Sequence, residues 1–361
     1  MLRGELYRPI YFAIITIMTI VVAQAYARRT SEHEQHSAVS IPFVSLLLTV
    51  FLVFAIGFRP IYRGFVDMFN YNEWFYHLQS TMPVFRWDWS LNNVFFSNIL
   101  SWCAKTFPTP TEFYLINAFI YFGGIFIACR RMFPGNTLAA LLTYLAAFST
   151  FAYAVNGVKA GVAASVFLVA LTFHNRKWVM VLLALVSIGF HHSMHVCFIG
   201  LLVACVYNKP KFYLGVWVLC FFVAMFHITA FQELFASVSD DSRYISQDVV
   251  DEDKGIGGFR IDFILYSFTP IAMGIYAIYF KQFKSEMYNF LLSVYLIVNS
   301  AWLLCIYANF TNRIAYLSWL MLPIVLIYPL LHPRFTDGRF RLFGSVILAH
   351  LSFTLFMNFV Y

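Results

Sequence analysis

Long apolar runs separated by short polar connections dominate the chain. A transmembrane helix needs about 20 mostly apolar residues, and the runs approach that length. We place them at residues 9–26, 40–57, 112–129, 137–154, 159–173, 178–190, 194–207, 212–230, 262–280, 287–306, 312–331 and 341–358. The two runs beside His191 are short, and the alternative for them is one broken or re-entrant element. The pattern predicts an all-α, polytopic integral membrane protein with about 12 transmembrane helices in a single domain over residues 1–361.

Two longer connections interrupt this pattern, at residues 58–111 and 231–261. The stretch Trp89–Phe107 in the first is apolar but is broken by polar residues, namely Asn92, Asn93, Asn98 and Lys105. We interpret it as a helix lying along the membrane surface, and a further span is the alternative. The second connection, rich in acids and glycines, is interpreted as a segment over the outer face.

Composition supports a membrane protein. The chain is 61% hydrophobic and 20% aromatic, and its mean hydropathy is +0.73, beyond what a soluble globular domain uses. The six cysteines are scattered without a CxxC pair, which excludes a zinc ribbon or a disulfide framework. The net charge of +7 is explained by topology, so no nucleic-acid partner is expected.

Basic residues give the expected orientation. One set of connections, beginning with Arg28 and Arg29, carries 13 basic and 4 acidic residues, whereas the opposite side carries 11 basic and 13 acidic residues. Cytoplasmic loops carry the excess of Lys and Arg, so both termini and both long connections are predicted to lie outside. The N-terminal apolar run lacks a small-residue cleavage site and is interpreted as a retained span.

Several motifs are missing from the sequence. It contains no GxxxxGK[ST] phosphate loop and no GxGxxG after a strand, which argues against ATP as the energy source and against a bound dinucleotide. No cytoplasmic domain could hold a nucleotide sugar. No cofactor is expected, and any glycosyl donor would arrive through the membrane attached to a lipid.

The first candidate cluster is GFRPIYRGFVDMFNY at residues 57–71, which contains Arg59, Arg63, Asp67 and Tyr71. If the segment is helical past Pro60, the four-residue spacing places these side chains on one face. Two guanidiniums beside a carboxylate and a phenol can bind an anion. The alternative is a juxtamembrane helix whose charges serve solubility.

The second cluster begins the run after residue 156, in NGVKAGVAASVFLVA. Lys159 there lies near a predicted helix N-terminus, and both the ammonium and the free N–H groups attract an anion. Asn156 precedes it. The alternative is a lysine that snorkels to the membrane interface.

The third cluster is FHHSMH, with His191, His192, Ser193 and His195. A histidine near neutral pH can remove a proton from an attacking hydroxyl. Three alternatives are weighed: a metal bound by His191 and His195, a Ser–His nucleophile pair, and structural interfacial histidines. The missing carboxylate and the missing GxSxG turn argue against the first two, so no metal site is expected.

The remaining candidates lie later in the chain. Arg313 begins a span and Tyr316 follows one turn on; an ionisable residue at such a position is functional by default because its burial is expensive. The acidic connection holds Asp240, Asp241, Arg243, Tyr244 and Arg260. Its adjacent acids could bind a divalent cation or be simply solvated. Arg243 and Arg260 are candidate anion ligands.

The predicted topology places these clusters on the outer face, where they can form one cationic pocket. Cations suit a diphosphate, and a histidine beside them suits proton removal. Together they indicate glycosyl transfer from a polyprenyl-diphosphate-linked sugar, in which the cations stabilise the leaving diphosphate and lipid anchoring supplies proximity.

The order of motifs resembles a known family. It runs R…GxxDxxxY (Arg59, Gly64, Asp67, Tyr71), NxxKxxxA (Asn156, Lys159, Ala163), FHxS (Phe190, His191, Ser193) and NRxxY (Asn312, Arg313, Tyr316). Over roughly residues 40–330 the chain is similar to EpsG-type polysaccharide polymerases, within the broader Wzy-like O-antigen and exopolysaccharide polymerases. It departs from them at Lys159-Ala160, where the family usually carries Arg, often followed by Gln. Lysine cannot make the bidentate phosphate contact of arginine.

The resemblance implies a glycosyltransferase that joins undecaprenyl-diphosphate-linked oligosaccharide units at the periplasmic face of a bacterial inner membrane. The implied partners are these lipid-linked oligosaccharides, membrane lipid and a chain-length regulator. His191 is the expected general base, since the HxS spacing favours it over His192. Asp67 and Tyr71 would orient the cations or the acceptor sugar. The rival functions are a glycan ligase, a single-sugar transferase, and a flippase or transporter for the lipid-linked unit.

Overall fold

The computed structural model describes residues 3–28, 42–228, 258–308, 311–335 and 338–360. The described residues are mostly helical and contain no strand. The all-α prediction is therefore confirmed. Contacts divide the chain into two compact units, a first unit of Met1–His191 with Leu330–Tyr361 and a second unit of His192–Pro329. The single domain expected from the sequence stays a prediction.

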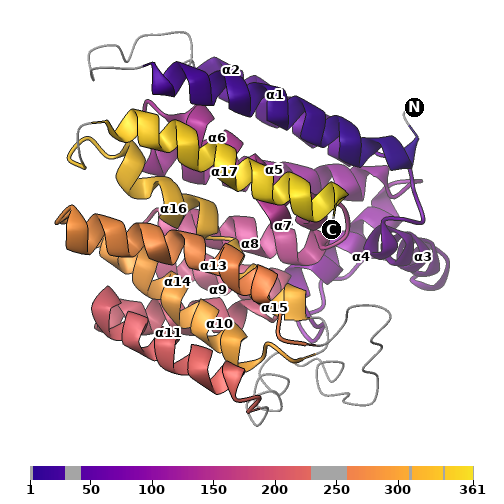
Figure 1. Ribbon diagram of the computed structural model, residues 1–361. Helices are drawn as coiled ribbons and strands as arrows, with labels where there is room; N and C mark the ends of the chain where they lie inside the picture. The colour runs from indigo at the N-terminus through magenta and orange to yellow at the C-terminus, as the bar shows by residue number, and fades with distance from the viewer. Residues whose placement is uncertain (1–2, 29–41, 229–257, 309–310, 336–337, 361) are drawn as a thin grey trace. The chain divides into compact units, whose positions relative to one another are not determined.

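The first unit contains ten of the labelled helices in Figure 1. They are α1 (Tyr7–Ala27), α2 (Pro42–Gly57), α3 (Val66–Thr81), α4 (Val94–Thr106), α5 (Thr111–Met132), α6 (Thr137–Leu145), α7 (Phe148–Val155), α8 (Val158–Leu171), α9 (Lys177–Phe190) and α17 (Arg339–Phe359).

The second unit is held together by buried polar pairs. Its helices are α10 (Met194–Val206), α11 (Pro210–Met225), α13 (Ile261–Ile275) with a π-helical turn (Tyr276–Phe280), α14 (Glu286–Leu304), α15 (Thr311–Trp319) and α16 (Leu322–Leu331), whose last two residues belong to the first unit. The Asn299 side chain accepts from Trp217 Nε1 at 2.7 Å and donates to Ser318 Oγ at 2.9 Å. Such pairs join helices where lipid offers no hydrogen-bond partner.

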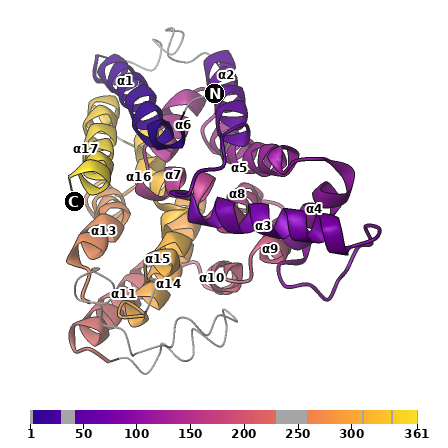
Figure 2. The same cartoon turned by 90° about the vertical axis from the view of Figure 1, so that its right-hand side faces the viewer.

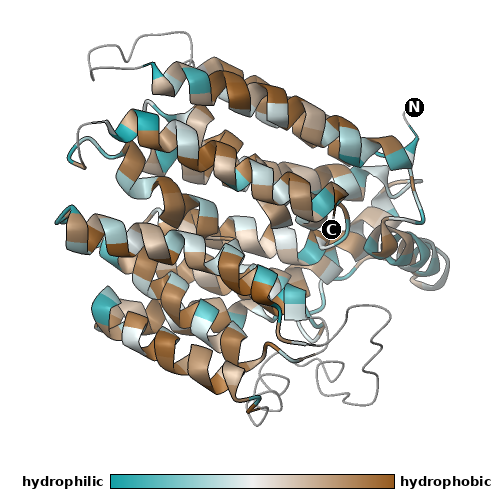
Figure 3. Cartoon of the chain, in the orientation of Figure 1, coloured by the Kyte–Doolittle hydropathy of each residue, from teal (hydrophilic) through white to brown (hydrophobic). Residues whose placement is uncertain are grey.

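The chain is a multi-pass membrane protein, but twelve spans are not supported. Each predicted run contains a helix, yet only six described helices are long and apolar enough to cross a membrane, or seven if one bent pair is a single span. Five further apolar helices have only 10–17 residues. The apolar residues along the middle of α1 are visible in Figure 3. Counting apolar runs overestimated the spans because runs such as 159–173, 178–190 and 194–207 form helices of only 13 or 14 residues, short of the about 20 that a span needs.

The predicted span 137–154 contains this bent pair, which is a broken span or a re-entrant loop. Helices α6 and α7 meet at 73°. The bend frees backbone carbonyls, and side chains bond them: Tyr11 Oη donates to Leu145 O at 2.7 Å and Thr150 Oγ1 donates to Tyr144 O at 2.6 Å. A carbonyl left unpaired in a membrane would cost several kcal/mol, so these bonds stabilise the bend.

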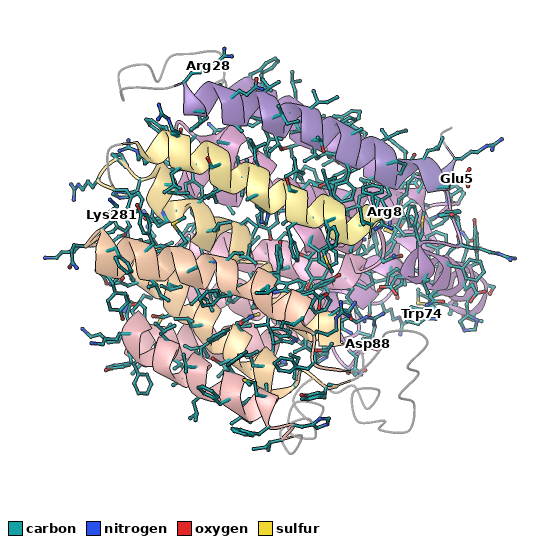
Figure 4. All side chains as sticks on the ribbon, viewed as in Figure 1. Glu5, Arg8, Arg28, Trp74, Asp88 and Lys281 are labelled. Carbon is teal, nitrogen blue, oxygen red and sulfur yellow. The ribbon has the colours of Figure 1, made fainter. Side chains whose placement is uncertain are left out.

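Helices α1 and α17 lie side by side and antiparallel (Figure 1). Near one end, Arg8 Nη2 donates to Asn358 Oδ1 at 2.7 Å. Near the other, the Tyr26 and Phe343 rings lie 4.8 Å apart. Figure 4 shows Arg8 and Arg28 close to opposite ends of α1. Both helices therefore run the full depth of the first unit.

The two ends of the first unit differ in chemistry. At one end the C-terminus of α5 meets the C-terminus of α8, where Arg131 Nε donates to Thr172 Oγ1 at 2.8 Å. This basic end also contains Arg28, Arg130, Arg176 and Lys177. At the opposite end, here called the Arg59 end, Gly4 packs on Tyr62. The predicted grouping of basic connections thus holds within this unit, and which end faces the cytoplasm stays a prediction.

The connection 58–111 forms helices α3 and α4, which pack on each other (Figure 2). The predicted surface helix exists as α4, whose 13 residues are too few for a span; its placement on a membrane stays a prediction. Asn98, interpreted as a break, stabilises the turn before α4, because its side chain bonds Asp88 N at 2.9 Å and Asp88 O at 2.8 Å. The connection 231–261 lies mostly outside the described residues.

Candidate functional site

The first cluster does not form one helix. Helix α2 ends at Gly57 and α3 begins at Val66, with non-helical backbone between them. The predicted stack of Arg59, Arg63, Asp67 and Tyr71 on one face is therefore wrong. Pro60 cannot continue a helix, since its ring clashes with the preceding turn and its nitrogen carries no hydrogen. Only Asp67 and Tyr71 share a helix, four residues apart on α3.

Arg59 is the buried cation of this connection. Its side chain is 5% exposed, Nη1 donates to Ile56 O at 2.6 Å, and the guanidinium carbon lies 4.9 Å from the Tyr114 ring centre. Nε and Nη2 are buried without a hydrogen-bond partner. Burial lowers the pKa of Arg59 to about 10, opposed in part by the Tyr114 and Tyr7 phenols. The side chain therefore remains charged at neutral pH.

The other members of the first cluster lie in different surroundings. Arg63 is exposed and Asp67 is half-buried in the first turn of α3. Tyr71 is 5% exposed, with its ring 5.0 Å from the Phe96 ring and 6.2 Å from the Phe113 ring. Tyr71 thus packs α3 against α4 and α5.

One face of α5 carries polar side chains, beginning at the Tyr114 ring that Arg59 contacts. Tyr114, Asn117 and Tyr121 lie three and four residues apart, so they share this face. Asn117 is 1% exposed, and its Nδ2 donates to Phe113 O at 2.7 Å. Its Oδ1 is buried without a hydrogen-bond partner. A second unpaired polar atom therefore lies one helical turn from the ring that Arg59 contacts.

Helix α8 lies against this face in parallel register. A Cβ on Gly161 would lie 3.3 Å from the Tyr121 ring, and one on Gly124 would lie 2.8 Å from Ser165 Cβ. The same offset, continued toward the Arg59 end, places Asn117 beside Gly157, the residue before α8. The α5 face and the start of α8 therefore lie at one level.

The second cluster surrounds this helix start. Asn156 is half-buried and its Oδ1 is a third buried atom without a hydrogen-bond partner. Lys159 is the second residue of α8 and is half-buried. The free N–H groups of a helix start carry partial positive charge. The Lys159 ammonium, the free N–H groups of α8 and the Asn156 acceptor therefore lie in one short segment near the Arg59 end.

His191 ends α9 at the same end of the first unit. Helices α8 and α9 pack on each other, have 14 residues each and are joined by the short turn 172–176. Equal lengths return the chain to the level of Gly157, and packed helices lie about 8–10 Å apart. Arg59, Asn156, Lys159 and His191 therefore lie at one end of this unit, and their roles stay predictions.

The other predicted residues belong to the second unit. His192 O accepts a hydrogen bond from His195 at 2.6 Å, and the two rings are stacked 5.7 Å apart. Ser193 is buried before α10. Arg313 is exposed on α15, and the Tyr316 ring lies 5.4 Å from Trp319. Their roles stay predictions.

Arg260 is engaged by a carboxylate. Nε donates to Asp262 Oδ1 at 2.9 Å and Nη2 donates to Oδ2 at 2.6 Å, and the guanidinium lies over the Phe263 ring. This edge of Arg260 is therefore occupied, unlike that of Arg59. Arg243, with the acidic connection around it, lies outside the described residues. Within the described ranges, no group of three His, Cys, Asp or Glu side chains could hold a metal ion.

Sequence reasoning missed Tyr114 and Asn117. Both lie inside the apolar run predicted at 112–129 and carried no recognised motif. The available signal was Asn117 itself, since a side-chain amide inside a membrane span is expensive and commonly functional. The signal for Tyr114 was weaker, because tyrosine is common throughout this chain.

Comparison with known proteins gives the family. No curated protein and no solved structure matches the chain. The family model described as "EpsG family" matches residues 42–361, which include the second unit, the first unit without α1, and all the clusters described above. The chain belongs to the EpsG family.

Proposed function

We propose that this protein is a membrane glycosyltransferase that polymerises polyprenyl-diphosphate-linked oligosaccharide units at the outer face of a bacterial inner membrane. Membership of the EpsG family supports a polysaccharide polymerase in broad terms. The observation that carries the site assignment is the buried Arg59 guanidinium with Nε and Nη2 unpaired. A buried charge is costly unless it is paired, so this group is suited to a ligand that supplies the pairing.

The chemistry of the free edge favours phosphate. Nε and Nη2 form one edge of the guanidinium and donate in parallel, which suits bidentate contact with a carboxylate or phosphate. Arg260 in the same chain shows this geometry, since its corresponding edge holds both Asp262 oxygens. In Arg59 the same edge has no hydrogen-bond partner, so a diphosphate that reached it would supply both acceptors.

The remaining groups at the Arg59 end fit the proposed reaction. The acceptor hydroxyl oxygen attacks the anomeric carbon of the donor sugar, and the bond from that carbon to the diphosphate oxygen breaks. His191 takes the hydroxyl proton. Arg59, Lys159 and the start of α8 stabilise the charge on the leaving polyprenyl diphosphate. Asp67 orients the cations or the acceptor sugar in this proposal, and Tyr71 packs α3 against α4 and α5.

Polymerisation in vitro tests the proposal. Purified protein in nanodiscs is given a lipid-linked repeat unit, and chain-length ladders are resolved on gels. Arg59→Lys, which keeps the charge and loses the bidentate edge, and His191→Gln are each expected to lower the rate at least 100-fold. The matched controls are Arg86→Lys and His77→Gln, because both residues are exposed in the same connection.

The outcomes separate the rival functions. Normal ladders from folded Arg59→Lys and His191→Gln proteins would refute the site assignment. Transfer of one finished glycan without extension would instead indicate a ligase, and addition of one sugar would indicate a single-sugar transferase. Movement of intact lipid-linked units across a vesicle membrane would indicate a flippase. Arg63, Arg313 and His192 are tested by the same assay as separate variants.

A further inference from the structure

We infer that Asn117 binds a hydroxyl group of the donor sugar next to the diphosphate, so that α5 supplies a sugar subsite beside the Arg59 anion subsite. This inference rests on the proposed function and adds the residue that distinguishes a glycosylated lipid from its bare diphosphate.

The orientation of the Asn117 amide is fixed by a contact. Because Nδ2 donates to Phe113 O at 2.7 Å, the opposite flip would place two carbonyl oxygens against each other. Oδ1 is therefore the free atom, and an amide oxygen accepts hydrogen bonds. It is 1% exposed at the residue level and has no partner, which makes it an acceptor lacking a donor.

The position of Asn117 relative to Arg59 suits one ligand. Arg59 contacts Tyr114, and Asn117 lies three residues further along α5, about 4.5 Å along the helix axis. The Arg59 edge lacks an acceptor, whereas Asn117 lacks a donor. A sugar diphosphate offers acceptors at the phosphates and hydroxyl donors on the adjoining ring, at a comparable separation.

Asn156 adds a second acceptor at the same level. The register of α5 with α8 puts Asn117 at the level of Gly157, the residue that follows Asn156, and Asn156 Oδ1 is also buried and unpaired. Two unpaired acceptors, one on α5 and one in the turn before α8, together with the unpaired donor edge of Arg59, match a polyhydroxyl ligand with an anionic end. An inorganic anion alone would satisfy Arg59 and leave both amides unpaired.

Two lipids test the inference on the intact protein in nanodiscs. The probes are undecaprenyl diphosphate and undecaprenyl diphosphate carrying one hexose. Wild-type protein should prefer the glycosylated lipid. Asn117→Leu, of similar shape, should reduce that preference about tenfold, as expected for the loss of a hydrogen bond worth about 1.4 kcal/mol, with unchanged binding of the bare diphosphate. Arg59→Leu should weaken both lipids, and Asn98→Leu is the control for loss of a buried amide.

A thermal melt separates a binding role from a structural one. Asn117→Leu removes an unpaired acceptor together with one hydrogen bond, from Nδ2 to Phe113 O. Asn98→Leu removes three hydrogen bonds. The melting temperature should therefore fall much less in Asn117→Leu than in Asn98→Leu. If Asn117→Leu does not fold, Asn117→Ala removes the same acceptor. Unchanged lipid preference in a folded Asn117 variant overturns the inference alone. Failure of wild-type protein to bind either lipid overturns the proposed function as well.

Discussion

The Tyr114 ring lies 4.9 Å from the Arg59 guanidinium, while the Tyr114 hydroxyl donates to Met68 O at 2.7 Å. This one side chain of α5 therefore contacts the buried Arg59 and also holds α3 in place. Non-helical backbone separates Arg59 from α3 in the sequence. A change at Tyr114 should be felt both in stability and at the anion site.

Two substitutions divide these roles. Tyr114→Phe keeps the ring and removes the hydrogen bond, so the free energy of unfolding should fall by about 1 kcal/mol with unchanged anion binding. Tyr114→Leu also removes the cation–π contact, worth about 1–2 kcal/mol when desolvated, and should weaken anion binding. Thermal melts and pyrophosphate titrations check both, with Tyr76→Phe, an exposed tyrosine on α3, as the control. Equal anion binding by both Tyr114 variants would contradict the division.

Pyrophosphate should stabilise the folded protein through Arg59. A ligand that binds only the folded state adds about 2.7 kcal/mol at one hundred times its dissociation constant, and the melting temperature should rise accordingly. Arg59→Leu should abolish that rise and Arg86→Leu should retain it. A rise that survives Arg59→Leu would place the anion elsewhere.

The acid limb of the pH–rate profile should depend on His191. A general base acts only when unprotonated, so polymerisation should slow as pH falls and histidine becomes protonated. His191→Gln should lower the rate and remove that dependence, whereas His77→Gln should retain it. If His192→Gln removes the acid limb and His191→Gln does not, the base is assigned to the wrong histidine.

Gly161 lets α8 start close to α7. A Cβ there would lie 2.8 Å from the Tyr153 backbone oxygen, and backbone cannot move aside cheaply. Gly161→Ala should therefore cost about 1–3 kcal/mol of stability and slow polymerisation by displacing Lys159. Gly123→Ala is the matched control, since nothing lies within 4 Å of its added Cβ and alanine favours the helix. Equal melting temperatures for the two variants would refute the packing argument.

His332, after α16, should make stability sensitive to acid. Burial, and then the nearby Arg334 and Arg339 charges, lower its pKa below the ordinary value. The unfolded chain therefore takes up a proton first as pH falls, and stability is lost from about pH 6.5 downward. The loss of melting temperature between pH 7.5 and 5.5 should be smaller in His332→Gln than in wild type. An identical loss in both proteins would show that other groups titrate.

The helices were largely predictable from the sequence, whereas the number of spans was not. Apolar runs locate helices because a membrane tolerates little else, and each run did contain one. The 73° bend between α6 and α7 escaped prediction because both halves are equally apolar. Helix α3 was not predicted because it is rich in polar residues and therefore contains no apolar run.

Candidate residues were easiest to choose where charge is rare. Arg59, Lys159 and His191 stood out in a chain with 11% charged residues, and their roles in a site stay predictions. Asn117 and Tyr114 could not be ranked above other residues of the same types without knowing which face of α5 contacts Arg59. The helical stack through Arg63 failed because the four-residue spacing was applied across Pro60.

The bend between α6 and α7 has a consequence for biogenesis. The donor to Leu145 O is Tyr11 on α1, and Tyr121 on α5 donates to Thr150 O at 3.0 Å. Both tyrosines precede the bend in the chain, so synthesis delivers each donor to the membrane before the carbonyl that it bonds. A Tyr11→Phe chain should consequently reach the membrane in lower yield, while the molecules that do assemble polymerise at the normal specific rate.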